Sequence, residues 1–476
     1  PASILGAYGN PDVRTPNIDR LAQQGMLFRN AFAANSMCSP TRATLMTGLM
    51  PSQHGVHNWL DDSLMDKWPR DWSAIAEYRT LPLTLANRGY QTAMIGKWHL
   101  GQPWEPSVGF QHWVTFTDGH TVDFWNNTII ENGEVYRLEN RHTVDFFAEK
   151  AAQYLEQYDA GKPFYLQLNL NGPYLNPPSN YGPARNRHYS SYLESEFASF
   201  PRVAFNANVA HQLIEPETPD FLIKKHLEAI AMHNDRETMA NVASQNTVVD
   251  DAVGQVLKAL EASGLADSTL VIFSSDQGNF YGQHGLWQHA VVTSPTSLYE
   301  AAMNIPLIVR HPGAVRSGSE NPRLIGQYDL PVTILDYLGL NVPLEGSPGR
   351  SFSGLLRGKD TSWEDEVFYE QEESRGIRTP EYAYWKRLEG TGTAELYDMK
   401  SDPGQHRNLI DDPAVQSAIA ALDKRLEGFF SRYSDPKYDL WQGGIAKGSV
   451  IRPGLFQKLY GPEWQPRTDL IAPFQE

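Results

Sequence analysis

Short apolar runs alternate with longer segments of helical periodicity along most of the chain. Four of the runs are rich in β-branched or aromatic residues and have the length of buried strands: residues 91–96, 163–170, 269–275 and 305–310. Three of them follow segments with helical spacing of apolar positions, at residues 81–88, 143–159 and 234–263. Helix and buried strand in alternation predict an α/β domain, with a large, mostly parallel sheet between layers of helices. In such sheets, functional residues gather on loops just beyond the strand ends.

The pattern changes after a stretch rich in glycine and proline at residues 346–350. Three short alternating segments follow, at residues 367–371, 382–388 and 395–399. An amphipathic segment at 413–433 then places apolar side chains at helical spacing. These segments predict a small α+β subdomain, in which one helix packs on an antiparallel sheet. We therefore divide the chain into an α/β domain, residues 1–357, and a C-terminal subdomain, residues 358–476.

Composition narrows the class of protein. The 476 residues include 40 Lys and Arg against 56 Asp and Glu, so the formal net charge is −16. Such an acidic balance argues against a nucleic-acid or anionic-membrane binder, which needs a basic face. No run reaches the roughly 18 apolar residues of a membrane-spanning helix. The single cysteine excludes a disulfide framework and a cysteine-rich zinc module.

That cysteine lies in the segment Met-Cys-Ser-Pro-Thr-Arg-Ala-Thr-Leu-Met-Thr-Gly, residues 37–48. A lone cysteine is more often a small buried apolar residue than a reactive one. Here, however, Cys38 precedes an apparent helix start, and Arg42 follows one helical turn later. A cysteine at a helix N-terminus beside a guanidinium lies in an electropositive environment that favours anions.

The segment resembles the signature of the type I sulfatases, in which the cysteine is converted after translation to formylglycine (3-oxoalanine). Companion motifs occur in the same order as in that family and extend over nearly the whole chain: Thr-Pro-Asn-Ile-Asp-Arg-Leu-Ala at 15–22, Pro-Ser-Gln-His-Gly-Val at 51–56, Gly-Lys-Trp-His-Leu-Gly at 96–101, Ser-Asp-Gln-Gly at 275–278 and Glu-Leu-Tyr-Asp at 395–398. The resemblance implies an alkaline phosphatase-like α/β sandwich, a sulfuric ester hydrolase activity and maturation by a formylglycine-generating enzyme.

The resemblance also implies roles for individual residues. The hydrated aldehyde derived from Cys38 would attack sulfur, beside one Ca²⁺ ion held by that group, Asp276 and Gln277. Arg42 would hold the hydrated aldehyde, Lys97 would bind the sulfate oxygens, and His99 would carry the proton that releases sulfate. Taken alone, each of these residues has an ordinary structural explanation: a turn, a solvated lysine or a buried histidine. His54 and His284 also match family positions.

Three departures from the family pattern affect the expected chemistry. The family has two adjacent Asp ligands just before the position of Pro1, so we expect that an N-terminal strand carrying them is missing here. Two other Asp pairs are poor substitutes. Asp61 and Asp62 lie in a polar stretch that we expect to face solvent, and residues 250 and 251 lie in a helix, where adjacent side chains point about 100° apart.

The other two departures concern the leaving group. Tyr174 stands where the family usually has a histidine, and tyrosine, with an ordinary pKa near 10, is a weaker acid at pH 7. His289 stands where the family commonly has a lysine, so it is our candidate for binding sulfate and protonating the leaving group. An equally open interpretation is that His289 is an ordinary loop histidine.

The sequence therefore predicts a sulfatase acting on a sulfated saccharide or another alkyl or aryl sulfate. Two alternatives stay open: a phosphonate monoester or phosphodiester hydrolase of the same superfamily, and an inactive, anion-binding relative. The identity of the ester, the oligomeric state and the compartment also stay open. A bacterial periplasm or secretion is slightly favoured over the cytoplasm.

Overall fold

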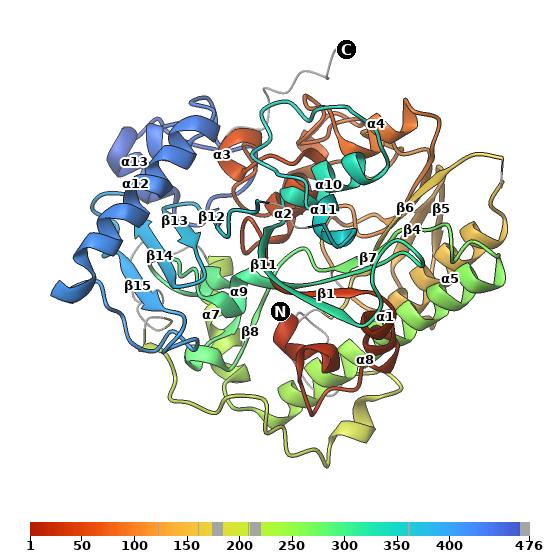
Figure 1. Ribbon diagram of the computed structural model, residues 1–476, viewed down its shortest axis with the longest axis horizontal. Coiled ribbons are helices and arrows are strands. Elements are labelled where there is room, and N and C mark those ends of the chain that lie inside the picture. Colours follow the sequence, from red (N-terminus) through yellow and green to blue (C-terminus); the bar gives the residue numbers. More distant parts are fainter. Residues whose placement is uncertain are drawn as a thin grey trace.

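The computed structural model describes residues 1–121, 123–159, 161–173, 184–207, 209, 220–359 and 362–466. A four-stranded sheet lies at the centre of the main body (Figure 1), with strand order β11-β1-β10-β7. Strand β1 runs parallel to β11 and antiparallel to β10, and β10 runs antiparallel to β7. The bounds are β1 (Met26–Phe32), β7 (Val271–Ser274), β10 (Asn304–Arg310) and β11 (Ser319–Gly326).

A five-stranded sheet has the order β5-β4-β3-β2-β6. Strand β2 is parallel to β3 and β6, whereas β4 is antiparallel to β3 and β5. Asn132 and Gly133 connect β4 to β5 with positive φ angles of 49° and 90°, as a tight hairpin turn requires. The bounds are β2 (Gln91–Gly96), β3 (His112–Phe116), β4 (Thr128–Glu131), β5 (Glu134–Arg137) and β6 (Phe164–Asn169).

The α/β class is confirmed, and the four runs expected to be strands form β2, β6, β7 and β10. The sheets are mixed, although the alternation indicated a mostly parallel sheet. The length of one loop explains why β10 and β11 run in opposite directions. Residues 311–318 join β10 to β11 across the end of β1, and this loop is shorter than the roughly twelve residues that a parallel crossover needs.

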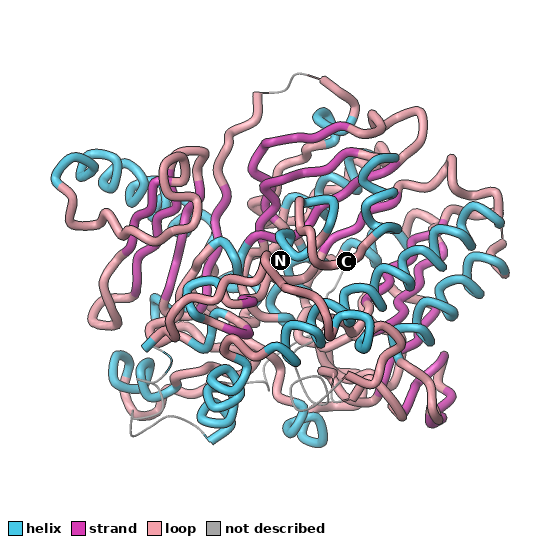
Figure 2. The backbone as a smooth tube through the Cα atoms, turned by 90° about the horizontal axis from the view of Figure 1, so that it is seen from below, coloured by secondary structure: helices cyan, strands magenta, loops and turns pink. Residues whose placement is uncertain are grey.

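Helices cover both faces of the four-stranded sheet because successive side chains point to opposite sides. Leu27 and Ile308 pack towards α1 (Pro16–Gln24) and the long helix α8 (Arg236–Ala262). Phe28 and Leu307, one residue along each strand, pack towards helices α10 (Asp329–Tyr337) and α11 (Ser353–Leu356). Figures 1 and 2 show these layers from two sides.

The five-stranded sheet is covered in the same way. Ile95 and Val114 pack on α5 (Thr143–Glu156), whereas Met94 and Trp113 share a cluster with Met46 of α2. Shorter elements complete the main body: α2 (Cys38–Thr47), α3 (Pro51–His54), α4 (Leu81–Ala86), α7 (Asp220–Met232), α9 (Glu300–Met303), β8 (Phe280–Tyr281) and β9 (Trp287–Gln288).

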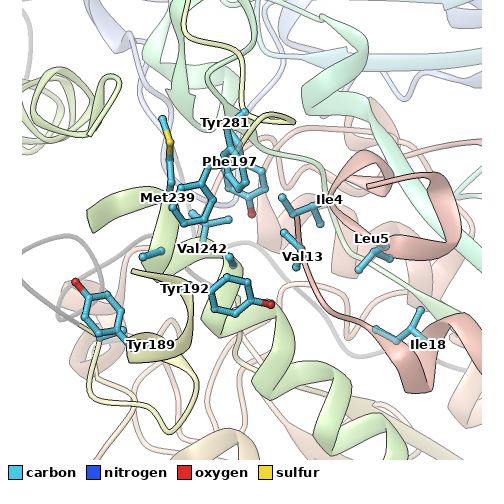
Figure 3. Close-up of a cluster of buried hydrophobic side chains, with 14 of the residues drawn as sticks. Ile4, Leu5, Val13, Ile18, Tyr189, Tyr192, Phe197, Met239, Val242 and Tyr281 are labelled. Carbon is cyan, nitrogen blue, oxygen red and sulfur yellow. The ribbon is translucent and has the colours of Figure 1, made fainter. Parts of the chain in front are cut away.

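The N-terminal segment is part of the core. Ile4, Leu5 and Val13 lie with Met239 and Val242 of α8 in one buried cluster, which also holds aromatic side chains of residues 189–200 (Figure 3). This packing leaves Pro1 partly buried and near Asp276.

The C-terminal part has the predicted architecture. Four antiparallel strands in the order β12-β13-β14-β15 form a sheet, and α12 packs on it through Leu422, Leu426 and Phe430. This unit lies to one side of the main sheets in both Figure 1 and Figure 2. The bounds are β12 (Val367–Gln371), β13 (Ser374–Arg378), β14 (Tyr382–Arg387), β15 (Glu395–Asp398), α12 (Gln416–Tyr433) and α13 (Pro453–Tyr460). The domain boundary after residue 357 stays a prediction.

The sequence did not predict strand β13 because the pattern of its residues is polar. Its arginines are nevertheless buried, since each is paired with carboxylates. Arg375 contacts Glu370 at 3.2 Å and Asp439 at 2.6 Å. Within the part of the chain that the structure describes, no helix has the length and apolarity needed to cross a bilayer.

Glu372, in the turn between β12 and β13, predicts how stability depends on pH. It is buried, accepts hydrogen bonds from Asn58 and the Ile451 backbone, and has a pKa raised to about 8 by burial and by the charge of Glu373. The unfolded carboxyl ionises near pH 4.5, so the folded state binds more protons between pH 4.5 and 8, and stability falls as the pH rises. Glu372→Gln is expected to remove this part of the fall in melting temperature between pH 5 and pH 8. An identical fall in the wild type and the variant would contradict the prediction.

Candidate active site

Helix α2 begins at Cys38, so the cysteine occupies the helix N-terminus that the sequence indicated. Its side chain is only 3% exposed, and Cys38 Sγ lies 3.1 Å from Nδ1 of His99. The helix is buried on almost all sides.

His99 is held by a second contact on the opposite edge of its ring. Nε2 lies 3.0 Å from the carbonyl oxygen of Leu60, and the backbone of His99 has a positive φ of 56°. A carbonyl can only accept, so Nε2 carries a proton and donates it to Leu60. In the neutral ring, Nδ1 is then an acceptor that faces Cys38.

Arg42 joins three parts of the site from the next turn of α2. Its Nη1 donates to the carbonyl oxygen of Lys97 at 2.8 Å, and its Nη2 pairs with Oδ2 of Asp276 at 2.8 Å. Lys97 follows β2, and Asp276 follows β7, so the chemical groups lie beyond strand ends. Lys97 is fully buried.

Charges within the site shift three pKa values. Burial opposes ionisation of the Cys38 thiol, but the charges of Lys97 and His99 outweigh it and lower the thiol pKa well below its usual value. Burial likewise opposes ionisation of Asp276, and the cations Arg42 and Lys97 lower its pKa below the usual range. Burial, together with the charge of Arg42, lowers the pKa of Lys97. The interior therefore favours an anion at the position of Cys38.

Gln277 follows Asp276 in the loop after β7. Its Nε2 contacts Nδ1 of His289 at 2.8 Å, while its Oε1 is buried and has no hydrogen-bond partner among the described residues. This amide oxygen and the carboxylate of the preceding residue, Asp276, are the kinds of donor that suit a hard divalent cation. No group of three His, Cys, Asp or Glu side chains in the described ranges is arranged to hold a metal ion.

The comparisons with known proteins show the family of this chain. The profile of the Sulfatase family matches residues 2–340, which is most of the chain. The chain belongs to the sulfatase family. As a member of this family, it is a sulfuric ester hydrolase. A second profile, described as N-sulphoglucosamine sulphohydrolase, C-terminal, matches residues 282–431 of this sulfatase.

Two curated relatives match over nearly their whole length. The sulfatase is 26% identical to the N-acetylglucosamine-6-O-sulfatase of Bacteroides thetaiotaomicron, over 93% of this chain and 87% of the relative. It is 28% identical to the human N-sulphoglucosamine sulphohydrolase, over 97% of this chain and 92% of the relative. A structure solved in complex with its substrate D-glucosamine-2-N,6-O-disulfate superposes with a TM-score of 0.73 at 24% identity, covering 91% of this chain and 95% of that one. This likeness confirms the predicted alkaline phosphatase-like fold.

The structure of this sulfatase brings five of the predicted residues together: Cys38, Arg42, Lys97, His99 and Asp276. Gln277 and His289 form a pair beside them. Tyr174 lies outside the described residues. His54 is buried against α2, with Nε2 3.3 Å from the Thr44 hydroxyl. His284 instead stacks on Tyr299, with 3.8 Å between ring centroids.

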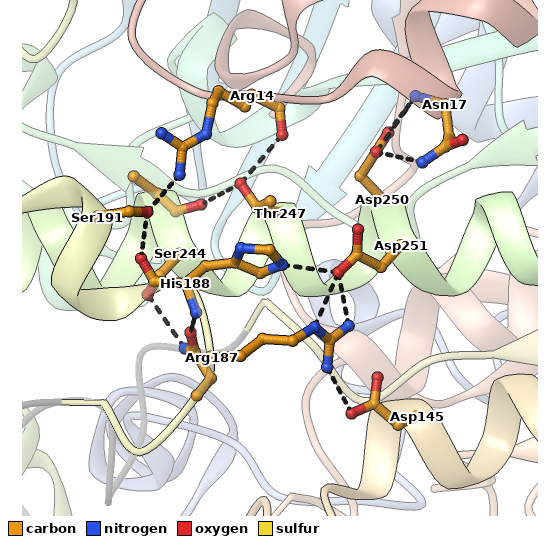
Figure 4. Close-up of polar contacts among 12 residues, drawn as sticks. Arg14, Asn17, Asp145, Arg187, His188, Ser191, Ser244, Thr247, Asp250 and Asp251 are labelled. Carbon is orange, nitrogen blue, oxygen red and sulfur yellow. Dashed lines mark hydrogen bonds and ion pairs between the residues drawn. The ribbon is translucent and has the colours of Figure 1, made fainter.

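The structure supports the rejection of Asp250 and Asp251 as metal ligands. Asp250 accepts hydrogen bonds from the backbone of Asn17 and Ile18 and so caps the first turn of α1. Asp251 contacts Arg187 and His188 instead (Figure 4). The two carboxylates thus leave α8 in different directions, and protein donors satisfy each of them.

The expectation that Asp62 faces solvent was wrong. Its side chain is 19% exposed, because the loop after β3 folds over it and His120 bonds to it through both Nδ1 and the backbone amide. Asp62 Oδ1 also lies 4.0 Å from Nε2 of His99. His120 was missed altogether. The available signal was the polar segment Asp-Gly-His-Thr just beyond the end of β3, where functional loops of α/β sheets gather.

Proposed function

We propose that this sulfatase hydrolyses a sulfate ester of an amino sugar, using a formylglycine made from Cys38 by a formylglycine-generating enzyme. The observation that carries the proposal is a buried Cys38 at a helix N-terminus, in contact with His99 and near the charge of Lys97, with Arg42 bonded to the Lys97 backbone. The names of the relatives, a glucosamine-6-O-sulfatase and a sulphoglucosamine sulphohydrolase, support the amino sugar.

Formylglycine would supply a nucleophilic oxygen, and one Ca²⁺ ion would supply positive charge next to it. Asp276 and Gln277 Oε1 would hold the ion, together with an oxygen at position 38. These groups are oxygen donors, as Ca²⁺ prefers. They are fewer than its usual six to eight ligands.

The chain's own residues perform the remaining tasks. His99 Nδ1, fixed by the bond of Nε2 to Leu60, is the acceptor that takes a proton from the group at position 38. Lys97 places a buried positive charge beside the same group, where it stabilises the negative oxygens of a sulfate. Arg42 Nε is buried without a hydrogen-bond partner among the described residues, so it can donate to an anionic oxygen.

The test is the intact mass of the peptide that contains Cys38, from protein made together with a formylglycine-generating enzyme. The peptide is expected to be about 18 Da lighter than the unmodified form. The same preparation should release sulfate from D-glucosamine 6-sulfate faster than it cleaves a phosphonate monoester or a phosphate diester. A modified protein that cleaves only the phosphorus esters would replace our proposal by the hydrolase alternative. A modified protein that cleaves none of these esters would favour the alternative of an inactive, anion-binding protein.

A further inference from the structure

We propose that His120, held by Asp62, protonates the leaving oxygen of the sulfate ester. The inference rests on the proposed function and adds a catalytic residue to it. Neither residue belongs to the motifs by which the sequence resembles sulfatases. The two acid candidates that the sequence offered do not settle this role: Tyr174 lies outside the described residues, and a ring nitrogen of His289 already contacts Gln277.

The first argument is connectivity. Asp62 stands between two histidines: one carboxylate oxygen lies 4.0 Å from Nε2 of His99, and the other bonds to Nδ1 of His120. The two rings are 6.0 Å apart between centroids. Because His99 in turn contacts Cys38, the contacts run without a break from the nucleophile position to His120.

The second argument is that the chain is built for this close approach. A Cβ on Gly119 would lie 2.0 Å from Oδ1 of Asp62 and 2.9 Å from Cδ2 of His99. Only glycine at position 119 therefore allows the loop to place His120 against Asp62. The backbone amide of His120 also donates to Asp62 at 3.1 Å, so the carboxylate holds both the ring and its main chain.

The third argument is exposure. Cys38, Lys97 and His99 are almost completely buried, whereas the side chain of His120 is 46% exposed. The carboxylate binds the Nδ1 edge of this ring, so the opposite Nε2 edge is left to carry a transferable proton. The bond to His120, with the charges of both histidines, outweighs burial and lowers the pKa of Asp62 to about 2. The carboxylate therefore stays ionised as it orients the ring.

The proposed step balances as follows. The nucleophile oxygen forms a bond to sulfur while the bond from sulfur to the sugar oxygen breaks, and its electron pair moves to that oxygen. The protonated ring of His120 gives the Nε2 proton to the sugar oxygen, which leaves as an alcohol, and the ring becomes neutral. Water then returns a proton to the ring. Without this transfer, the sugar would have to leave as an alkoxide, which is a poor leaving group.

The test compares two esters in protein containing formylglycine and Ca²⁺. D-Glucosamine 6-sulfate needs a proton at its leaving oxygen, and 4-nitrophenyl sulfate does not. His120→Gln is expected to lower kcat/KM on the sugar sulfate by about 10²- to 10⁴-fold, which is the usual contribution of general acid catalysis to the rate. The value for the nitrophenyl ester should change by no more than about threefold. Asp62→Asn should give a smaller loss with the same selectivity.

The matched control is His188→Gln, which removes a histidine from another Asp–His pair, with Nε2 2.6 Å from Asp251 on α8. It should leave the ratio of the two rates unchanged. Equal losses on both esters in His120→Gln, or no loss on either, would overturn the inference. Melting temperatures of all variants separate misfolding from lost chemistry. Wild-type turnover tests the proposed function, and the ratio between the esters tests His120, so the two failures are distinguishable.

Discussion

Cys38→Ala is expected to reduce sulfate ester hydrolysis by about 10⁴-fold or more. Cys38 contacts His99 at the N-terminus of α2 and lies within reach of the charge of Lys97, so we expect no neighbouring side chain to take over as nucleophile. Losses of this size follow when an enzyme loses its covalent nucleophile. Initial rates on D-glucosamine 6-sulfate, at matched Ca²⁺ concentration, measure the effect.

The control for this variant is its stability. Alanine removes one sulfur atom from a buried position, and the expected cost is about 1 kcal/mol, which a protein of this size should tolerate. A melting temperature within a few degrees of the wild type would show that the fold is intact. Activity above one hundredth of the wild type in such a folded variant would refute the assignment of Cys38.

Arg42→Met is expected to damage both stability and catalysis. It leaves the carboxylate of Asp276 without the guanidinium that contacts it at 2.8 Å, and it also removes the hydrogen bond to the Lys97 carbonyl. An uncompensated charge in a mostly buried site costs about 3 kcal/mol. The loss of a donor aimed at developing negative charge lowers kcat by about 10²- to 10³-fold.

The double variant Arg42→Met with Asp276→Asn separates the two effects. Removing the carboxylate removes the uncompensated charge, so the double variant should unfold at a higher urea concentration than Arg42→Met alone. Its activity should stay lost, because both the guanidinium and the carboxylate charge that would bind the proposed Ca²⁺ are gone. A double variant no more stable than the single one would show that charge compensation is not what Arg42 provides.

The sequence was informative where the structure depends on neighbours along the chain. The helix start at Cys38, Arg42 one turn later, and the loops after β2 and β7 all follow from local patterns, and the resemblance to sulfatases covers the same motifs. Their meeting in space was an implication of that resemblance, and the structure brings five of the residues together, while their catalytic roles stay a prediction.

Features that depend on distant contacts escaped the sequence. Asp62 and His120 are 58 positions apart, and their contact exists only because a loop carrying Gly119 closes over the site. Strand β13 looked polar because of its arginines, but Arg375 is neutralised by Glu370 and by Asp439, which is 64 positions away. Periodicity reports whether a side chain is apolar, and a buried charge with its partner supplied from elsewhere gives no such signal.

The depth of Cys38 also has a consequence for biosynthesis. Nine of the ten residues of α2 are buried, and the cysteine itself is buried against His99. If Cys38 becomes formylglycine as we propose, the modifying enzyme would have to meet the nascent chain before this helix docks. Treating purified, native protein with such an enzyme would come too late, and co-expression is the route to an active preparation.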